Sequence, residues 1–179
     1  MEINGEQVDG NIEYSKLDLS PEIMRAIEKK GYVQATPVQV GAIPPFMEWR
    51  DVIAKAPTGT GKTFAFGIPM VEHIDPASAD VLGLILAPTR ELAIQIQDEL
   101  RDLCAFKEGV RVVCLYGGQP IDKQIAGLKK KPQIVVATPG RLMDHMKRRT
   151  VRLDKVQTVV LDEADRMLDM GFIRDVTRI

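Results

Sequence analysis

The stretch Ala56–Thr63, with the sequence Ala-Pro-Thr-Gly-Thr-Gly-Lys-Thr, carries residues that can hold a polyphosphate. Gly59 and Gly61 lack Cβ atoms, so the backbone can wrap closely around phosphate oxygens and point its N–H groups at them. Lys62 adds a positive charge for the terminal phosphates, and Thr63 offers a hydroxyl to Mg²⁺. The pattern predicts a phosphate-binding loop, whose nucleotide-binding residues are Thr58, Gly59, Thr60, Gly61, Lys62 and Thr63.

The segments on either side of this loop fit the predicted role. Asp51–Ala54 is mostly apolar and predicts a short buried strand, and Phe64–Val71 predicts an apolar helix with a kink at Pro69. A helix that begins directly after the loop turns its N-terminus toward the anion. The alternative interpretation, a glycine-rich turn with one exposed lysine, fits this strand–turn–helix context less well.

A group of acidic residues follows Thr158–Leu161, an apolar run that predicts a strand. Asp162, at the end of this strand, can hold Mg²⁺ directly or through water, opposite Thr63. Glu163 is placed to orient or deprotonate an attacking water. The predicted catalytic residues are therefore Lys62, Asp162 and Glu163, with Thr63 and Asp162 at the metal. The alternative is an acidic helix N-terminus stabilised by the helix dipole, which the phosphate-binding loop makes less favoured.

Strand and helix patterns alternate between these two motifs. Apolar runs at 82–87, 111–116 and 133–137 predict strands, and helical spacing of apolar residues predicts helices at 91–103, 121–128 and near 142–147. Repeated strand–turn–helix units imply an α/β fold with a mostly parallel sheet and helices on both faces. Right-handed crossovers place the turns after the strands along one edge, where ligands bind.

Three of these turns contain groups that suit a phosphodiester backbone. They offer hydroxyls, glycine N–H groups and two guanidinium groups, contributed by Thr89, Arg90, Gly117, Gly118, Thr138, Gly140 and Arg141. Ordinary turn chemistry with solvated arginines explains the same residues equally well. From the residues alone, both interpretations stay open.

Two helix-start patterns precede the loop. Ser20 can cap a helix that begins at Pro21 and ends near Gly31. The second pattern, Thr36-Pro37-Val38-Gln39, is typical of a capping box in which Gln39 folds back to the N–H of Thr36. The Gln39 carboxamide can also donate and accept on one nucleobase edge, as in an adenine sensor. The residues alone favour the cap and leave the sensor as the alternative.

The composition excludes several other classes of protein. The chain has 179 residues, a net charge of −1 and two cysteines, which predicts one ordinary globular domain without a disulfide framework or a global basic field. No apolar run approaches the length of a membrane span, and no signal peptide is recognisable. We expect a cytoplasmic, reducing location and no membrane partner.

The ordered motifs resemble the first RecA-like domain of DEAD-box ATP-dependent RNA helicases. They comprise Gly31-Tyr32 through Gln39, Ala56–Thr63, Pro88–Ala93, Gly117-Gly118, Thr138–Arg141 and Asp162–Phe172, and they cover nearly the whole chain beyond its first residues. Each motif alone is moderately specific, and the ordered set is very specific.

The resemblance implies ATP and Mg²⁺ as cofactors and RNA as a partner bound through its backbone. It implies that Gln39 reads adenine and that Tyr14, where the family usually has Phe, stacks on the base. It also implies an RNA track of Pro88, Thr89, Arg90, Gly117, Gly118, Thr138, Pro139, Gly140 and Arg141. Ala35 stands where the family often has Pro, and we expect only local loosening there.

The family's Ser-Ala-Thr motif and second RecA-like domain are not found in the sequence. We therefore expect a polar tail at 1–13 and a C-terminally truncated helicase ATP-binding domain at 14–179, which acts when joined to a second domain. A nucleotide-binding module without turnover and a DNA-directed motor are the alternatives. In the family fold, a further strand lies between Asp51–Ala54 and Val159–Leu161, so we expect an empty slot between these two strands.

Overall fold

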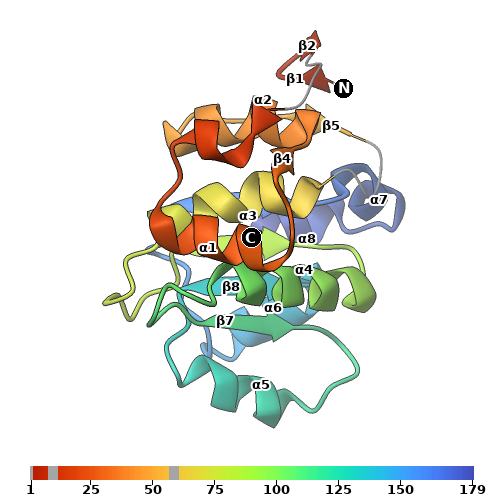
Figure 1. The fold of residues 1–179 in the computed structure, drawn as a ribbon. Coiled ribbons are helices and arrows are strands. Elements are labelled where there is room, and N and C mark those ends of the chain that lie inside the picture. The colour runs from red at the N-terminus through yellow and green to blue at the C-terminus, as the bar shows by residue number, and fades with distance from the viewer. Residues whose placement is uncertain (1, 8–11, 57–60) are drawn as a thin grey trace. The chain divides into compact units, whose positions relative to one another are not determined.

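The computed structural model describes residues 2–7, 12–56 and 61–179 (Figure 1). The chain forms two compact units. Unit 1 comprises Met1–His73 and Asp102–Glu108, and unit 2 comprises Ile74–Arg101 and Gly109–Ile179. Each unit has its own secondary structure and its own apolar cluster. The predicted residues Thr58, Gly59 and Thr60 lie outside the described residues.

A four-stranded parallel sheet organises unit 2. Its strands are β6 (Gly83–Leu86), β7 (Val112–Leu115), β8 (Ile134–Ala137) and β9 (Thr158–Leu161), in the spatial order β7-β8-β6-β9. Leu86 pairs with both Ala137 and Leu161, and Leu115 pairs with Ala137, so all four strands end in register. The predicted parallel sheet is confirmed, and so is the shared carboxyl edge for these four strands.

Helices α4 (Arg90–Leu103), α5 (Ile121–Leu128), α6 (Pro139–Lys147), α7 (Ala164–Asp169) and α8 (Ile173–Arg178) follow the strands. One face of the sheet buries its side chains against α5, α6 and α7 in a cluster that includes Leu84, Leu86, Leu115, Leu128, Val135, Leu142 and Met167. Every residue of β6 and β8 is buried. This double burial explains why these two segments are continuous apolar runs in the sequence.

Strand β9 differs from β6 and β8 because it lies at the edge of the sheet. It pairs with β6, and no described strand pairs with its other edge. Burial alternates along it, and Val159 and Leu161 are 55% and 44% exposed. The expectation of an open position beside β9 is met within the described residues.

The helices of unit 1 are α1 (Pro21–Lys29), α2 (Pro37–Met47) and α3 (Lys62–His73), preceded by the 3₁₀ turn η1 (Tyr14–Leu17). The predicted start of α1 is confirmed, because the Ser20 hydroxyl accepts a hydrogen bond from the N–H of Ile23 at 3.4 Å. Helix α2 packs against α3. The sequence pattern predicted only where α2 begins, because Pro44 and Pro45 inside the helix are residues that normally interrupt one.

The first residues contain regular backbone structure. β1 (Glu2–Ile3) and β2 (Glu6–Gln7) form a hairpin, and their turn residues Asn4 and Gly5 have φ of +51° and +85°. Two positive φ angles at an Asn-Gly pair are typical of the type I′ turn that suits a hairpin. A second small sheet pairs β3 (Ile12–Glu13) with β4 (Gln34–Ala35).

Strand β5 (Ala54–Lys55) is shorter than the predicted strand at 51–54 and pairs antiparallel with β1. The N–H of Asn4 donates to the carbonyl of Ile53 at 2.8 Å, and the Asn4 side chain accepts from the N–H of Ile53 at 2.7 Å. The N-terminal hairpin covers one edge of β5 and satisfies its backbone groups there. β5 ends this sheet, and the empty slot expected beside the segment stays a prediction.

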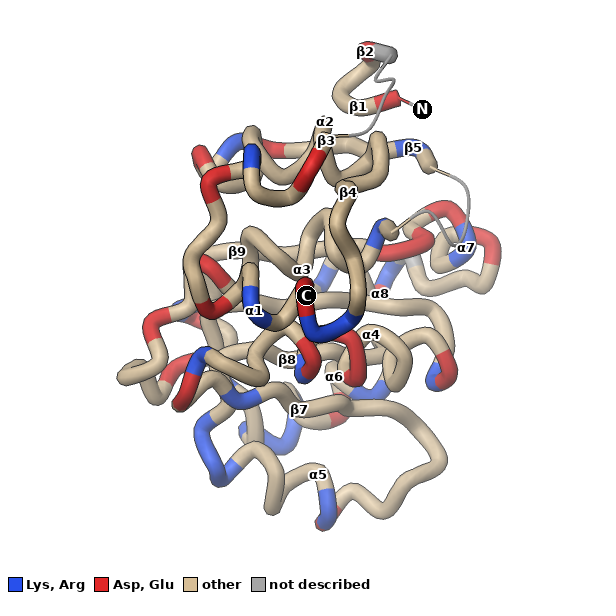
Figure 2. Tube along the Cα trace, viewed as in Figure 1, with Lys and Arg blue, Asp and Glu red and all other residues tan. Residues whose placement is uncertain are grey.

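Acidic and basic residues are interspersed along the trace of both units, in keeping with the small net charge (Figure 2). No helix among the described residues is both long and apolar enough to span a membrane.

Candidate functional site

The phosphate-binding loop ends at Gly61, which has a backbone conformation that favours glycine. Its φ is +82°, and a Cβ atom there would lie 2.3 Å from Nε2 of Gln39 and 3.1 Å from Oγ1 of Thr36. Lys62 and Thr63 form the first turn of the twelve-residue helix α3. Two residues predicted to hold phosphate and metal thus lie at a helix N-terminus, where backbone N–H groups and the helix dipole favour an anion.

Gln39 connects the start of α2 to this loop. Its Oε1 accepts from the N–H of Thr36 at 3.0 Å and from the hydroxyl of Tyr14, and its Nε2 donates to the carbonyl of Gly61 at 3.1 Å. The Thr36 hydroxyl is buried and has no hydrogen-bond partner among the described residues, so only the glutamine half of the capping box forms. Gln39 therefore acts as a cap, as the residues favoured, and also contacts the loop. Its reading of adenine stays a prediction.

Tyr14 is buried beside Gln39, with 2% of its surface exposed. Burial raises the pKa of its phenol to about 12, against the opposing effect of the hydrogen bond to Gln39. The hydroxyl therefore stays protonated and donates to Gln39. Stacking of this ring on a base stays a prediction and requires the ring to become exposed.

The predicted acidic residues follow β9 in unit 2. Asp162 is nearly buried, and its N–H donates to the carbonyl of Leu86 at 3.0 Å, which continues the sheet ladder by one residue. Glu163 has a φ of +52° and a ψ of +50°, a left-handed conformation that is costly for a residue with a side chain. Its carboxylate lies 3.7 Å from the guanidinium of Arg166. Since Lys62 and Thr63 belong to unit 1, their joint action with Asp162 and Glu163 stays a prediction.

Thr63 in unit 1 carries a hydroxyl oxygen, and Asp162 in unit 2 carries a carboxylate, and their joint binding of a metal stays a prediction. Mg²⁺ prefers such ligands and usually keeps several waters beside one or two protein groups and substrate phosphates. Among the described residues, no cluster of three or more histidine, cysteine or acidic side chains could hold a metal. The available donors therefore fit Mg²⁺ bound together with a nucleotide better than a metal held by the protein alone.

The three predicted RNA-binding turns follow β6, β7 and β8, at the carboxyl edge of the sheet in unit 2. Thr89 caps α4, because its hydroxyl oxygen accepts from the N–H of Leu92 at 3.2 Å. Its O–H can also donate, and a phosphate oxygen is a suitable acceptor. Pro139 begins α6, which leaves the first-turn N–H groups of Gly140 and Arg141 without partners inside the helix. Such groups at a helix N-terminus are ready donors to phosphate oxygens.

The two predicted arginines contact the same turn, Tyr116–Gln119. The guanidinium of Arg90 lies 4.9 Å from the centre of the Tyr116 ring and close to Gly118, where a Cβ atom would lie 3.4 Å from its Nη1. Arg141 donates from Nη1 to the carbonyl of Gln119 at 2.9 Å. The structure therefore brings Arg90, Gly118 and Arg141 together, and Pro88 and Thr138 precede the helices that carry the two arginines.

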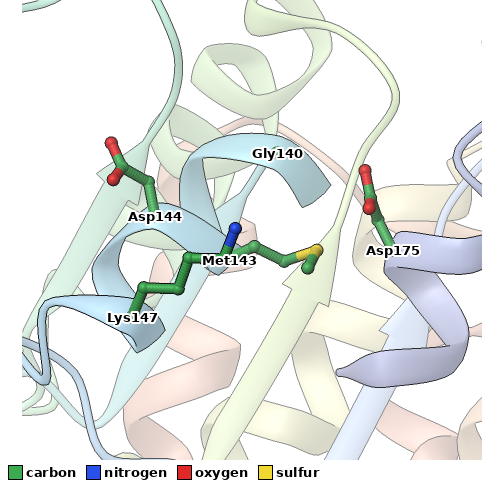
Figure 3. A pocket seen from close by; sticks show the side chains of 5 residues that line it. All are labelled: Gly140, Met143, Asp144, Lys147 and Asp175. Atoms are coloured by element: carbon green, nitrogen blue, oxygen red, sulfur yellow. The ribbon is translucent and has the colours of Figure 1, made fainter.

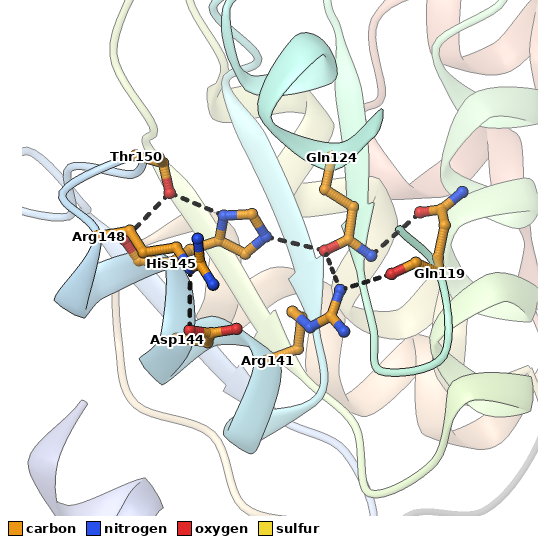
Figure 4. A network of polar contacts seen from close by, with 7 residues as sticks. All are labelled: Gln119, Gln124, Arg141, Asp144, His145, Arg148 and Thr150. Atoms are coloured by element: carbon orange, nitrogen blue, oxygen red, sulfur yellow. Dashed lines mark hydrogen bonds and ion pairs between the residues drawn. The ribbon is translucent and has the colours of Figure 1, made fainter. Parts of the chain in front are cut away.

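The residue patterns did not point to Gln124 and His145, which join this group (Figure 4). Both side chains are buried, and Gln124 contacts Tyr116, Gln119, Arg141 and His145. No local spacing marks these contacts, because they join residues up to 21 positions apart.

A pocket of about 390 Å³ lies along α6 (Figure 3). It is lined by Gly140, Met143, Asp144, Lys147 and Asp175. Its two carboxylates and single lysine make it a poor site for a phosphate, so it does not extend the set of phosphate-binding groups.

The parallel sheet with its flanking helices is of the RecA-like class. The family model for the DEAD/DEAH box helicase matches residues 36–179. The chain therefore belongs to the DEAD/DEAH box helicase family.

Individual relatives agree with this assignment. The chain is 53% identical over 166 residues to the DEAD-box ATP-dependent RNA helicase CshA of Geobacillus kaustophilus and 52% identical over 168 residues to that of Bacillus subtilis. These matches cover 93% and 94% of this chain but only 35% and 34% of the relatives. The crystal structure of a DEAD box protein from Methanococcus jannaschii matches with a TM-score of 0.85 and 42% identity, over 92% of this chain and 45% of that one.

Proposed function

We propose that this chain is the N-terminal, ATP- and RNA-binding part of an ATP-dependent RNA helicase. The observation that carries the proposal is the convergence of Arg90, Gly118 and Arg141 around one turn at the carboxyl edge of the sheet. The family and the named activity of the relatives support it.

On the nucleotide side, the loop and the N-terminus of α3 bind the phosphates, and Lys62 neutralises the charge of the terminal ones. Glu163 orients the attacking water and takes its proton. Mg²⁺, held by Asp162 and Thr63, would supply further charge neutralisation on the phosphate oxygens. Phosphoryl transfer depends mostly on positioning and charge, which this set of residues provides.

On the RNA side, hydroxyl, guanidinium and backbone N–H donors contact phosphates and carry no information about base sequence. We therefore expect binding to single-stranded RNA that depends on salt and tolerates any sequence. If this part neutralises about three phosphates, the slope of log affinity against log salt is about −2.

The longer protein would use a second RecA-like domain to complete the site. This chain spans about a third of its named relatives, which leaves room for such a domain in them. Closure of two domains on ATP would clamp and bend one RNA strand and separate a short duplex locally, and hydrolysis would release it.

A steady-state ATPase assay of the full-length protein tests the proposal. Turnover should rise with RNA and stay low with single-stranded DNA of the same sequence or without nucleic acid. Equal stimulation by RNA and DNA would favour a DNA-directed motor instead. ATP turnover that ignores every nucleic acid would overturn the RNA-helicase assignment.

The base specificity has its own test. If Gln39 exchanges its bonds to Thr36 and Tyr14 for an adenine edge, its carboxamide offers both a donor and an acceptor, and the site should reject GTP, which leaves these groups unpaired. Gln39→Ala should weaken ATP binding and leave the binding of inorganic triphosphate unchanged. Equal affinities of the unmodified protein for ATP and GTP would refute the predicted role of Gln39 in base recognition.

A further inference from the structure

The buried carboxamide of Gln124 uses its whole hydrogen-bonding capacity in one network (Figure 4). Its Nε2 donates to the carbonyl of Tyr116 at 2.8 Å and to Oε1 of Gln119 at 3.0 Å. Its Oε1 accepts from Nη1 of Arg141 at 3.1 Å and from Nε2 of His145 at 2.8 Å. Two donors and two acceptor sites are all that a carboxamide has, so the network leaves Gln124 no alternative orientation.

The orientation of Gln124 also fixes the tautomer of His145. The carbonyl of Tyr116 can only accept, so the amide nitrogen of Gln124 must face it and Oε1 must face the histidine. Nε2 of His145 therefore carries a hydrogen, and Nδ1 lies 2.8 Å from Oγ1 of Thr150, whose one hydroxyl hydrogen also has the carbonyl of His145 as an acceptor at 3.1 Å. His145 is fully buried, and its ring is held from both sides.

These contacts orient the guanidinium of Arg141. Its Nη1 donates twice within the protein, to the carbonyl of Gln119 and to Oε1 of Gln124. Within the described part of the chain, its Nε and Nη2 groups make no other hydrogen bond and are available for a phosphate. An arginine held in this way loses less rotamer freedom when it binds an anion.

The same contacts shape the turn that contains the two glycines. Gly117 and Gly118 have no side chains with which to fix their own conformation, and Gly118 has a φ of +91°. The residues on either side of them, Tyr116 and Gln119, are both hydrogen-bonded to Gln124. Gln124 therefore joins the glycine turn to the start of α6, which carries Arg141.

We propose that Gln124, supported by His145, is a positioning residue for RNA-backbone binding: it holds the Tyr116–Gln119 turn and the Arg141 guanidinium in one arrangement. The inference rests on the proposed function, because it assumes that these two groups contact phosphates. Gln124 itself is buried and acts through its neighbours.

The test compares RNA affinity and its salt dependence in the full-length protein, with a fluorescent single-stranded RNA and without nucleotide. Arg141→Ala should weaken binding about tenfold and flatten the slope of log affinity against log salt by about 0.7, the value of one phosphate contact on a single strand. Gln124→Met keeps the volume of the side chain and removes its hydrogen bonds, and it should reproduce most of both effects. The loss caused by Gln124→Met and Arg141→Ala together should be smaller than the sum of the two single losses, because both changes act on the contact made by Arg141.

A matched control separates positioning from stability. Gln133 is also fully buried, and it ties loops together just before β8 by bonds to Arg111, Pro76, Ser78 and Gly109. It lies before the strand rather than after it, so Gln133→Met should lower the melting temperature and leave the salt slope unchanged. His145→Gln retains a donor near the position of Nε2 and should keep RNA affinity, whereas His145→Leu should lose it.

The outcomes distinguish this inference from the proposed function. If the unmodified protein shows no salt-dependent RNA binding, the proposed function fails. If Arg141→Ala flattens the slope while Gln124→Met leaves it unchanged or adds fully to Arg141→Ala, the function stands and the positioning role is overturned. A change of slope in Gln133→Met equal to that in Gln124→Met would also overturn it, because the effect would then reflect stability.

Discussion

Gly61 is the residue at which backbone conformation and the nucleotide site depend on each other. Its positive φ and the 2.3 Å gap that a Cβ would leave to Gln39 are two separate reasons for glycine. Moving Gln39 would break its bond to the loop carbonyl and disturb its bonds to Thr36 and Tyr14. A methyl group added at position 61 would therefore disturb both the phosphate-binding loop and Gln39, the predicted base sensor.

We predict that Gly61→Ala lowers the free energy of unfolding by about 1–2 kcal/mol through backbone strain alone and strongly weakens ATP binding. Chemical denaturation and nucleotide titration measure the two effects. Gly140→Ala is the matched control, because no described atom beyond its chain neighbours and its own helix backbone lies within 4 Å of the added Cβ, and φ at Gly140 is not positive. If Gly61→Ala bound ATP normally, the close contact with Gln39 would have no functional role.

Glu163 combines a strained backbone with a predicted catalytic role. It follows Asp162, the first residue after β9, and its backbone is left-handed. In the full-length protein, Glu163→Gln should keep ATP and RNA binding and lower kcat by at least about a hundredfold, since a general base acts in the transition state. Lys62→Ala should instead impair nucleotide binding. Normal turnover by Glu163→Gln would remove Glu163 from the mechanism.

At the scale of elements, the sequence predicted those strands and helices whose signal is local. The apolar runs of β6, β8 and β9 and the cap of α1 are visible within a few residues and were confirmed. Pairings between distant segments were not predictable in this way. The hairpin at residues 2–7 covers β5 across about 50 residues of sequence, and no local pattern announces that contact.

The candidate site likewise contains residues with a local sequence signal and residues without one. The sequence motifs predicted Arg90, Gly118 and Arg141 as site residues. Gln124 and His145 lie on helices with ordinary amphipathic patterns, and their partners come from a turn and two helices. Only the folded arrangement reveals why two polar residues are buried there, since each is satisfied by groups distant in sequence.

The network between α5 and α6 should make the stability of the protein sensitive to acid. Burial, aided by Arg141 and Arg148 and opposed by Asp144, lowers the pKa of His145 below 6.5. Below pH 6.5 the unfolded chain then binds a proton that the folded chain does not. The contribution of neutral His145 to the free energy of unfolding is therefore fully present above pH 6.5. This contribution decreases as the pH drops, with a slope of at most about 1.4 kcal/mol per pH unit.

Urea denaturation between pH 7.5 and 5 measures this effect, and His145→Gln should reduce the slope. His73→Gln should leave the contribution of His145 in place, because His73 stacks on Trp49 and contacts Met47 instead. A slope unaffected by His145→Gln would show that other groups control the acid response.

At the scale of the whole molecule, the proposed catalytic cycle needs residues of this chain and residues of a second domain. An arginine finger contributes about 10³–10⁵ in rate where it is used. The resemblance places that residue in the second domain, so the chain alone should show almost no RNA-stimulated ATPase activity while still binding RNA. Side-by-side assays of this chain and the full-length protein measure the difference. Robust RNA-stimulated ATP turnover by the chain alone would contradict the proposal that hydrolysis needs the second domain.

The exposed edge of β9 leads to a prediction about association. Val159 and Leu161 are 55% and 44% exposed on a strand that no described strand pairs on its outer edge. An apolar edge strand with free N–H and C=O groups is a template for pairing with another chain. In isolation, residues 1–179 should therefore self-associate as concentration rises, which light scattering and gel filtration detect.

A charge on this edge should suppress the association. Val159→Lys places an ammonium group on the outer strand, where it opposes pairing with a second copy. Val33→Lys is the control, because Val33 is 67% exposed but lies outside any strand. Association should persist in Val33→Lys and decrease in Val159→Lys, since only the latter changes the edge. A monomer at every concentration, or equal behaviour of the two variants, would show that the open edge of β9 does not drive association.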